Sequence, residues 1–407
     1  MPFPLGIAAG DDFCSRKKDL IPAARKLAEG RNLWIQAEHR VGLTSYLGQL
    51  QNELAQNHEI PSISIDLGKI GDSAQLQSTL IQAYADLAEK VVIQNSNALQ
   101  SAGRSVKEAF LVFVPRLSFE AMGVKLSMAN LGDNSQDLIN AKLALDHIME
   151  GAAGRATLII DGLEKLEALD TGASSIAGNL KTLLETDSIS VVLAGATPEL
   201  LQQAAATKNQ LDLYTRCDKA PLSRIPSKSW IPFIKEKFLD HHGFIVPTPS
   251  TKFLLALTEN STEHVVNLSK ILMDTDSARL GDEESINNVL KNGWMDILRT
   301  NLINVDFLLF ELDGQIKREL LVELSKGGPV VAAGLIDKVD GSTHDDVADL
   351  LMDGYLTQDK IGCRLRLSSP LLKTYISLDQ GAGILSCLAD ECPVTHQHDD
   401  SPEPKAG

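Results

Sequence analysis

The first half of the chain alternates short apolar runs with longer segments in which apolar residues recur every three or four positions. Such runs are typical of strands buried on both faces, and such repeats are typical of amphipathic helices. The predicted strands are residues 32–36, 62–66, 156–161 and 188–193. The predicted helices are residues 19–29, 44–55, 73–94, 137–149 and 179–185. Strands separated by helices predict an α/β domain whose parallel sheet is covered on both faces.

In the second half the apolar repeats are mostly helical. Four helices are predicted at residues 229–241, 251–257, 263–273 and 285–300. Residues 305–377 contain a helix pair broken at Gly-Gly-Pro, a third helix at 343–352, an alternating strand and a last helix, the pattern of a small winged-helix domain. Residues 110–128 break the α/β rhythm, and a hairpin or an inserted pair of short strands are both consistent with them.

Composition narrows the range of functions only slightly. The chain has 407 residues and a formal net charge of −16, which argues against a broad electrostatic grip on nucleic acid but leaves room for a local basic patch. Five cysteines, odd in number and scattered, fit a reducing compartment. The start lacks a signal-peptide pattern, and no apolar run approaches the roughly 20 residues that span a bilayer. We therefore expect a soluble cytoplasmic protein that makes no membrane contact.

A short strand, a polar loop and a helix follow one another in the segment LWIQAEHRVGLTS, residues 33–45. The phosphate-binding pattern for such a loop is G-x-x-x-x-G-K-[ST], in which backbone N–H groups cradle phosphate, the Lys reaches the terminal phosphates and the hydroxyl holds Mg²⁺. Gly42 and Thr44 match this pattern, whereas Ala37 replaces the first Gly and Leu43 replaces the Lys. The segment predicts either a nucleotide-binding loop that has lost its chemistry or a chance match.

Three further loop residues bear on the same choice. Ser45 offers a second hydroxyl, and His39 and Arg40 offer positive charge, although a solvated loop pair explains the last two equally well. In a parallel sheet, ligands bind beyond the carboxyl ends of the strands, where this loop is expected to lie. The predicted nucleotide-binding loop therefore consists of Ala37, His39, Arg40, Gly42, Leu43, Thr44 and Ser45.

Another predicted strand ends in an acidic residue. The run ATLIID ends at Asp161, where P-loop enzymes place the carboxylate that orients Mg²⁺, so Thr44 and Asp161 are the predicted metal ligands. In hydrolytic enzymes of this kind a Glu commonly comes next and activates water, but Gly162 follows here. An apolar run that ends in Asp is also common for structural reasons, because Asp starts turns and caps helices.

Further along the chain, SVVLAGATPELLQQ leads to LDLYTRC and then to SKSWIPFIKEKF. The order of these segments resembles that of P-loop ATPases of the AAA+ and STAND type, especially the archaeal-type ATPase group and its relatives among replication-initiator and transposition ATPases. In that resemblance Gly195-Ala196-Thr197 matches the end of the sensor strand, and Arg216 matches an Arg that precedes the lid. The resemblance extends over about residues 13–378, although no single motif is intact.

The resemblance implies a domain organisation and a cofactor. Its five parts are an N-terminal segment and helix (1–30), a P-loop NTPase-like α/β core (31–220), a helical lid (221–300), a winged helix (301–378) and a flexible tail (379–407). The implied cofactor is ATP or ADP with Mg²⁺, and the absence of any nucleotide stays open. The resemblance also implies that Arg216 contacts a neighbouring subunit's nucleotide as an arginine finger. Pairing of Arg216 with Asp212 or Asp218 is the competing interpretation.

The departures from the family pattern predict inefficient catalysis. Without a Lys at the position of Leu43 the terminal phosphates lack their usual point charge, and Gly162 removes the water-activating carboxylate. Backbone N–H groups at a helix N-terminus still bind anions. We therefore predict no catalytic residue and a degenerate ATPase-family protein that acts as a regulatory or scaffold subunit, binding ATP or ADP without efficient hydrolysis. The alternative is an active ATPase with a relocated cation, either Arg40 or one from a neighbouring subunit.

The predicted winged helix bears on the choice of partner. Its third helix carries His344, Asp345, Asp346 and Asp349, and carboxylates that face phosphate repel it. Another protein subunit, bound through the winged helix or the lid, is therefore the predicted partner, and a homo-oligomer stays open. A DNA-binding adaptor with a basic wing is the other class of function, and its candidate residues are Lys338, Lys360, Arg364 and Arg366.

The tail carries four side chains of metal-binding type, namely Cys387, Cys392, His396 and His398. Their C-x4-C-x3-H-x-H spacing differs from the familiar structural zinc patterns, so a polar disordered tail is preferred over a zinc site. The sequence selects neither the pathway nor the partner, since ATPases of this type occur in transposition, replication, signalling and defence.

Overall fold

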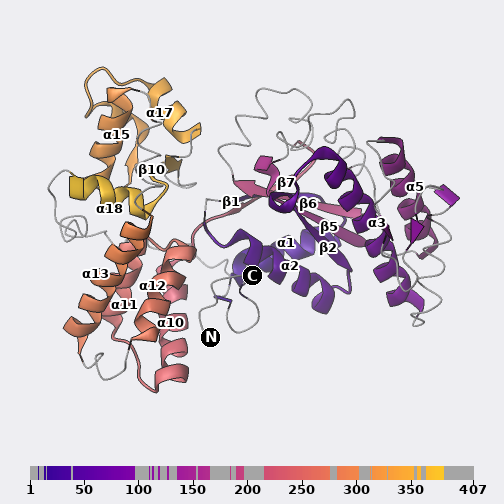
Figure 1. Cartoon of the computed structure of the whole chain (residues 1–407), viewed down its shortest axis with the longest axis horizontal. Helices are drawn as coiled ribbons and strands as arrows, with labels where there is room; N and C mark the ends of the chain where they lie inside the picture. Colours follow the sequence, from indigo (N-terminus) through magenta and orange to yellow (C-terminus); the bar gives the residue numbers. More distant parts are fainter. Residues whose placement is uncertain are drawn as a thin grey trace, which may run out of the picture. The chain divides into compact units, whose positions relative to one another are not determined.

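Two compact units make up the chain. The α/β unit is Gly6–Arg224, and the helical unit is Ile225–Gly407 together with Met1–Leu5. Figure 1 labels the elements of both units in the computed structural model. The structure describes residues 8, 13–14, 16–37, 40–96, 110, 112–113, 118–119, 126–127, 135–152, 155–165, 184, 189–196, 215–275, 282–301, 312, 314–327, 329–352, 355–358 and 364–379.

A five-stranded parallel sheet forms the centre of the α/β unit (Figure 1). Its order is β2-β5-β6-β1-β7, so β1 lies between β6 and β7, and β5 lies between β2 and β6. The predicted α/β fold class with a parallel sheet is therefore confirmed. The strands are β1 (Leu33–Ala37), β2 (Ser62–Asp66), β5 (Ala156–Asp161), β6 (Ile189–Ala196) and β7 (Asp218–Leu222).

Helices cover both faces of this sheet because successive side chains of each strand point to opposite faces. Leu158 and Ile160 of β5 belong to a buried cluster with α3 and α5, whereas Ile159 between them belongs to a second cluster with α1 and α2. Burial on both faces explains why these strands are apolar without alternation. The helices are α1 (Lys17–Ala28), α2 (Leu43–Asn57), α3 (Ser73–Ser96) and α5 (Ser135–Ala152).

The edge strand β7 has no counterpart among the predicted strands. Its sequence, DKAPL, is short and polar and contains Pro221, which reads as a turn rather than a strand. The structure tolerates this Pro because β7 lies at the edge of the sheet and pairs with β1 on one side. Pro has no backbone N–H to donate to a neighbouring strand and is therefore found in edge strands. Position in the sheet, which the local sequence does not contain, decides this element.

The irregular tract at residues 110–128 contains two short strands, β3 (Ser118–Phe119) and β4 (Leu126–Ser127). They pair antiparallel, with Ser118 opposite Ser127, as predicted for a pair of short strands. Of the helix predicted at residues 179–185, the structure describes Leu184, which is helical, and the other positions lie outside the described residues.

The helical unit begins with four helices at the predicted positions. These helices pack against one another, and Trp230, Phe238, Leu268 and Trp294 are all buried. The helices are α10 (Ser227–His242), α11 (Thr248–Thr258), α12 (Thr262–Asp274) and α13 (Glu283–Thr300).

The rest of the helical unit combines short helices with a small sheet. The three strands pair antiparallel in the order β8-β10-β9, and α15, α16 and α17 precede the β9–β10 pair in the chain. In chain order the elements are α15 (Gln315–Ser325), β8 (Val330–Val331), α16 (Ala332–Ile336), α17 (His344–Met352), β9 (Leu356–Gln358), β10 (Arg364–Leu367) and α18 (Pro370–Asp379).

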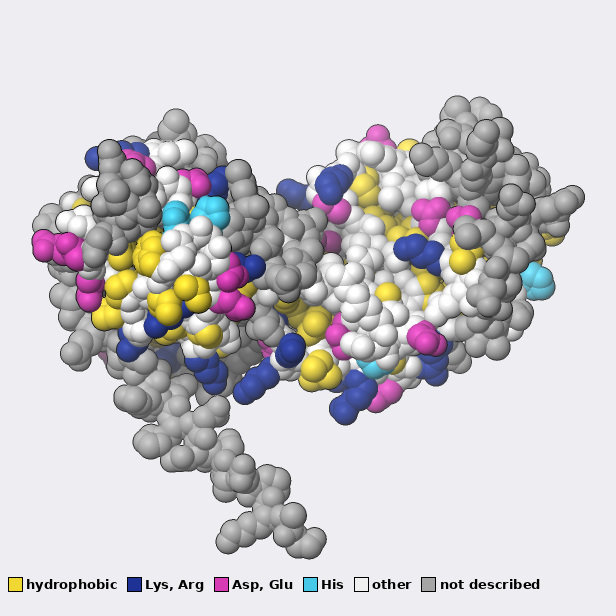
Figure 2. All heavy atoms as spheres, turned by 90° about the horizontal axis from the view of Figure 1, so that it is seen from below, with side chains coloured by type: hydrophobic (Ala, Val, Ile, Leu, Met, Phe, Trp, Pro, Cys, Tyr) yellow, Lys and Arg dark blue, Asp and Glu magenta, His cyan; other side chains and the backbone are white. Residues whose placement is uncertain are grey.

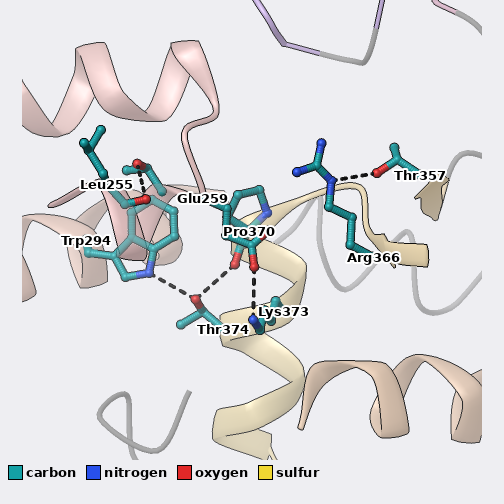
Figure 3. Close-up of polar contacts among 9 residues, drawn as sticks. Leu255, Glu259, Trp294, Thr357, Arg366, Pro370, Lys373 and Thr374 are labelled. Carbon is teal, nitrogen blue, oxygen red and sulfur yellow. Dashed lines mark hydrogen bonds and ion pairs between the residues drawn. The ribbon is translucent and has the colours of Figure 1, made fainter. Parts of the chain in front are cut away.

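Helix α18 joins the two parts of the helical unit (Figure 3). The indole Nε1 of Trp294 in α13 donates a hydrogen bond of 3.1 Å to Oγ1 of Thr374, and Lys373 Nζ lies 3.0 Å from Oε1 of Glu259. Thr374 in turn donates to the carbonyl of Pro370. The buried indole N–H therefore has its partner in the last described helix of the chain.

None of the helices among the described residues has the length and apolarity that crossing a bilayer requires.

Candidate functional site

Two predicted site residues, Ala37 and Asp161, lie at the carboxyl ends of parallel strands, at the same end of the sheet. Ala37 ends β1, Asp161 ends β5, and Asp66 ends β2 directly opposite Asp161 in the strand register. Ala196 of the sensor-like segment lies opposite Ala37 at the end of β6, whereas Thr197 lies outside the described residues. Sheets of this kind commonly bind ligands beyond the carboxyl ends of their strands, so this end of the sheet is the candidate site.

In the described part of the loop between β1 and α2, two residues have positive φ. Arg40 has φ 60°, and Gly42, which caps α2, has φ 82°. The carbonyl of Gly42 accepts the N–H of Tyr46 as the first helical hydrogen bond, so α2 begins at Leu43. A helix start leaves N–H groups without helical partners and carries partial positive charge, which favours an anion. Glu38 and the predicted site residue His39 lie outside the described residues.

The two predicted metal ligands are in contact. Thr44 Oγ1 donates a hydrogen bond of 3.0 Å to Oδ2 of Asp161, and Asp161 is buried with 7% of its surface exposed. Hydroxyl and carboxylate oxygens are the ligand types that Mg²⁺ prefers, and Mg²⁺ usually takes the rest of its ligands from phosphates and water. The described residues contain no group of three His, Cys, Asp or Glu that would hold a metal without such help. The pair therefore fits a Mg²⁺ that takes its remaining ligands from a nucleotide and water.

Leu43 does not replace the missing Lys in function. Its side chain is half-buried and packs against the apolar cluster that contains Leu47 and Leu50 of α2. Ser45 is also engaged, because its Oγ accepts a 3.0 Å hydrogen bond from the N–H of Ala8. In the first turn of α2, the Thr44 hydroxyl is the one hydrogen-bonded to the carboxylate at the end of β5.

The residue after Asp161 is a glycine with a left-handed backbone. Gly162 has φ +81°, a left-handed conformation that side chains rarely adopt. A Cβ built on Gly162 would lie 3.4 Å from the backbone nitrogen of Gly68 and 3.6 Å from Cβ of Leu67. A water-activating carboxylate at this position would thus have to be built on a strained backbone beside η2 (Leu67–Lys69).

The sequence interpretation missed Asp66 at this end of the sheet. Asp66 accepts a 2.9 Å hydrogen bond from the N–H of Gly68, and its other oxygen lies 3.1 Å from Lys69 Nζ. The signal was present, since the predicted strand SISID ends in Asp just as ATLIID does. Its contacts give Asp66 a turn-capping role next to the site.

Arg16 is a second residue that the sequence did not single out. It lies just before α1, is buried with 6% of its surface exposed, and donates to the backbone carbonyl of Val41 in the loop. Its neighbours Lys17 and Lys18 are exposed, and no sequence pattern separates the three. Cys14 beside it is also buried, and this burial raises the pKa of the thiol to about 12 although the Arg16 charge acts in the opposite direction.

Arg216 lies near the amino ends of the strands, whereas the loop lies at their carboxyl ends. It precedes β7, whose first residue Asp218 is opposite Leu33 at the amino end of β1, whereas Ala37 is at the carboxyl end. The first and last residues of β1 are four residues apart along an extended strand, which corresponds to about 13 Å. The structure therefore does not bring Arg216 to the nucleotide loop of its own chain, and a role at a neighbouring subunit's site stays a prediction. Of its two predicted partners, Asp218 forms ion pairs with Lys26 and Arg31, and Asp212 lies outside the described residues.

Comparison with known proteins bears on the fold of the whole chain. No protein-family model and no curated protein sequence matches it. Among solved structures, it is similar to a Walker-type ATPase of Pyrococcus abyssi, with a TM-score of 0.61 over 92% of this chain and 99% of that one, at 15% identity. The chain has the fold of a P-loop ATPase.

Another solved structure is more distant. The ORC2 protein of Aeropyrum pernix, in its ADPNP and ADP complexes, matches over 90% of this chain and 95% of that one, with a TM-score of 0.49 and 9% identity. At 15% identity, similarity to the Walker-type ATPase establishes the fold alone, and the function of this chain has to be argued from its own residues.

Proposed function

We propose that this chain is a degenerate member of the P-loop ATPases that binds ATP or ADP with Mg²⁺, does not hydrolyse ATP efficiently, and acts as a regulatory or scaffold subunit. The observation that carries the proposal is the contact between Thr44 and Asp161 at the start of α2. It combines a hydroxyl, a carboxylate and a helix N-terminus, which are the parts that bind Mg²⁺ and phosphate.

Inefficient hydrolysis follows from two further residues. Leu43 packs on the apolar core where a charged Lys would neutralise the terminal phosphates. Gly162 has the left-handed backbone that disfavours a water-activating Glu. Because these two losses affect different steps, charge neutralisation and water activation, repairing one of them would not restore efficient turnover.

Calorimetric titration of the purified chain with ATP and ADP, with and without Mg²⁺, tests the proposal directly. We expect saturable binding that is tighter with Mg²⁺ and weakened by Asp161→Asn. Phosphate release measured on the same sample should stay at background. Rapid Mg²⁺-dependent hydrolysis that Asp161→Ala abolishes would instead favour the alternative of an active ATPase with a relocated cation, for which Arg40 with its positive φ is the candidate within the described loop.

A role as a subunit rests on the helical unit. The order α15, β8, α16, α17, β9, β10 supports our assignment of a winged helix, because three helices and an antiparallel β9–β10 pair are its parts. Asp345 at the start of α17 is exposed, and Asp349 pairs with Lys317 of α15. This acidic helix supports a protein partner over DNA.

DNA binding through a basic wing is the second candidate, carried by Arg364 and Arg366 of β10. Arg364 is exposed, whereas Arg366 Nε donates to Thr357 of β9 (Figure 3). Lys338 pairs with Glu323 of α15, and Lys360 lies outside the described residues. In the view of Figure 2, Lys and Arg side chains and Asp and Glu side chains are both present on the described surface. Salt-sensitive duplex binding that Arg364→Glu abolishes would favour this candidate.

A further inference from the structure

The N-terminal segment holds the start of α2 at several points. The N–H of Ala8 donates to Ser45 Oγ over 3.0 Å, and the hydroxyl of Tyr46 donates to the carbonyl of Asp19 over 3.1 Å. Between these contacts, Arg16 Nη2 donates to the carbonyl of Val41 over 2.6 Å. The residues just before and just after the helix start are thus fixed from outside the loop.

Arg16 makes a second contact of the same kind. Its Nη1 donates to the carbonyl of Ser223. A guanidinium presents its donors in a planar fork, so one side chain can hold two separate carbonyls in a fixed relationship. Burying such a charge is costly unless its donors are satisfied, which makes both contacts hard to give up separately.

The two carbonyls belong to different segments, one in the loop before α2 and one just after β7. Val41 is buried and immediately precedes Gly42, the cap of α2, so its carbonyl fixes the final turn of the candidate phosphate loop. Ser223 immediately follows β7, and Ile225, two residues later, begins the helical unit. Arg16 therefore connects the loop to the segment by which the chain leaves the α/β unit.

We propose that Arg16 is a positioning residue that fixes the loop for phosphate and couples its occupancy to the exit segment, residues 223–226. The inference rests on the proposed nucleotide binding. Two sites linked through one rigid element influence each other reciprocally, so a phosphate that orders the loop also orders the exit segment. Arg16 acts through backbone geometry and needs no contact with the nucleotide.

Hydrogen–deuterium exchange of the full chain, with and without Mg-ATP, tests this coupling. In the wild type we expect ATP to slow exchange in peptides that cover residues 40–46 and also in those that cover residues 223–226. Arg16→Gln keeps polarity but loses the charged fork, and should weaken ATP binding about tenfold and abolish the protection of the exit segment. Lys17→Gln, an exposed neighbour, is the matched control and should change neither.

Arg16→Lys separates charge from geometry. An ammonium group retains the charge without the planar fork, so part of the ATP affinity should return while the exit segment stays unprotected. If ATP protects the loop in the wild type but not residues 223–226, or if Arg16→Gln keeps both protections, the inference is wrong. The wild-type measurement decides this even if the Arg16→Gln variant does not fold.

Failure of the proposed function gives a different result. If the wild type binds no nucleotide, the proposed function fails, and exchange without ligand still tests the link. Arg16→Gln should then speed exchange at both residues 40–46 and residues 223–226, whereas Lys17→Gln should speed neither. Faster exchange at the loop alone would show that Arg16 does not connect the two segments.

Discussion

The Thr44 hydroxyl donates a 3.0 Å hydrogen bond to the Asp161 carboxylate, although 117 residues separate the two in the chain. The contact depends on the parallel sheet, which places the end of β5 two strands away from the loop that follows β1. The fold thus brings together a hydroxyl and a carboxylate that we propose as ligands of a nucleotide-bound Mg²⁺. The P-loop pattern has a Lys and a Glu where this chain has Leu43 and Gly162.

Replacing Thr44 by Val tests the role of the hydroxyl. The change conserves side-chain volume but removes the oxygen that lies next to Asp161, so Mg²⁺ should lose a ligand. We expect the Mg²⁺-dependent gain in ATP affinity to fall about tenfold, measured by calorimetry at several Mg²⁺ concentrations. Thr79→Val, which removes a hydroxyl bonded within α3, is the control and should leave ATP affinity unchanged. An unaltered Mg²⁺ response in Thr44→Val would contradict the assignment.

Leu43→Lys restores the missing cation. A Lys at the start of α2 should tighten ATP binding about tenfold, or ~1.4 kcal/mol, because it adds a charge-assisted contact. It should also lower the free energy of unfolding by about 1–2 kcal/mol, since Leu43 packs against the core. Leu43→Met keeps the packing without the charge and should show neither effect. Titration and denaturant unfolding of both variants check this, and weaker ATP binding by Leu43→Lys would argue against a phosphate site.

Gly162→Glu should not create an efficient ATPase. The left-handed backbone at φ +81° penalises any side chain, so we expect Gly162→Ala to lose about 1–2 kcal/mol of stability. Gly243→Ala is the matched control: that glycine has φ +72° with nothing within 4 Å of a built Cβ, so it isolates the backbone cost. Turnover in Gly162→Glu at wild-type stability would overturn the backbone explanation.

Alkaline pH should destabilise the α/β unit through its buried thiols. Burial raises the pKa of Cys14 and of Cys217 from 9.0 to about 12. The folded chain keeps both protons up to about pH 12 and the unfolded chain releases them above pH 9, so these thiols leave stability unchanged below pH 9 and lower it between pH 9 and 12.

Urea unfolding of the wild type and of Cys14→Ala at pH 8, 9.5 and 10.5 measures this dependence. The buried tyrosines Tyr46 and Tyr84, whose pKa burial also raises, contribute a similar slope in both proteins. The alanine variant should therefore lose less stability over this range than the wild type. Equal slopes would mean that the Cys14 thiol ionises as freely in the folded chain as in the unfolded one.

Strands buried on both faces could be predicted from the sequence because their composition reports burial directly. The run ATLIID is β5 itself, from Ala156 to Asp161. The polar strand β7 could not, since only its place at the edge of the sheet makes Pro221 acceptable. A local sequence pattern therefore predicts central strands, which are buried on both faces, better than edge strands.

The candidate site also contains residues that the sequence could predict and residues that it could not. Thr44 and Asp161 follow from a motif, because motifs record side-chain types at fixed spacing. Arg16 and the backbone of Gly162 do not, since one depends on a fold-level approach to Val41 and the other on a φ angle. The sequence therefore indicated the candidate side chains, and the structure adds the Arg16 contact with the loop and the left-handed backbone of Gly162.

The central claim, binding without efficient hydrolysis, is tested most directly by following bound nucleotide in a single turnover. Excess protein is mixed with Mg-ATP labelled in the γ-phosphate, and the bound fraction is analysed over several hours. We predict that ATP is retained and stays ATP, and that Asp161→Asn reduces the amount retained. Conversion of the retained ATP to ADP and phosphate within minutes, or no retention by the wild type, would contradict the account.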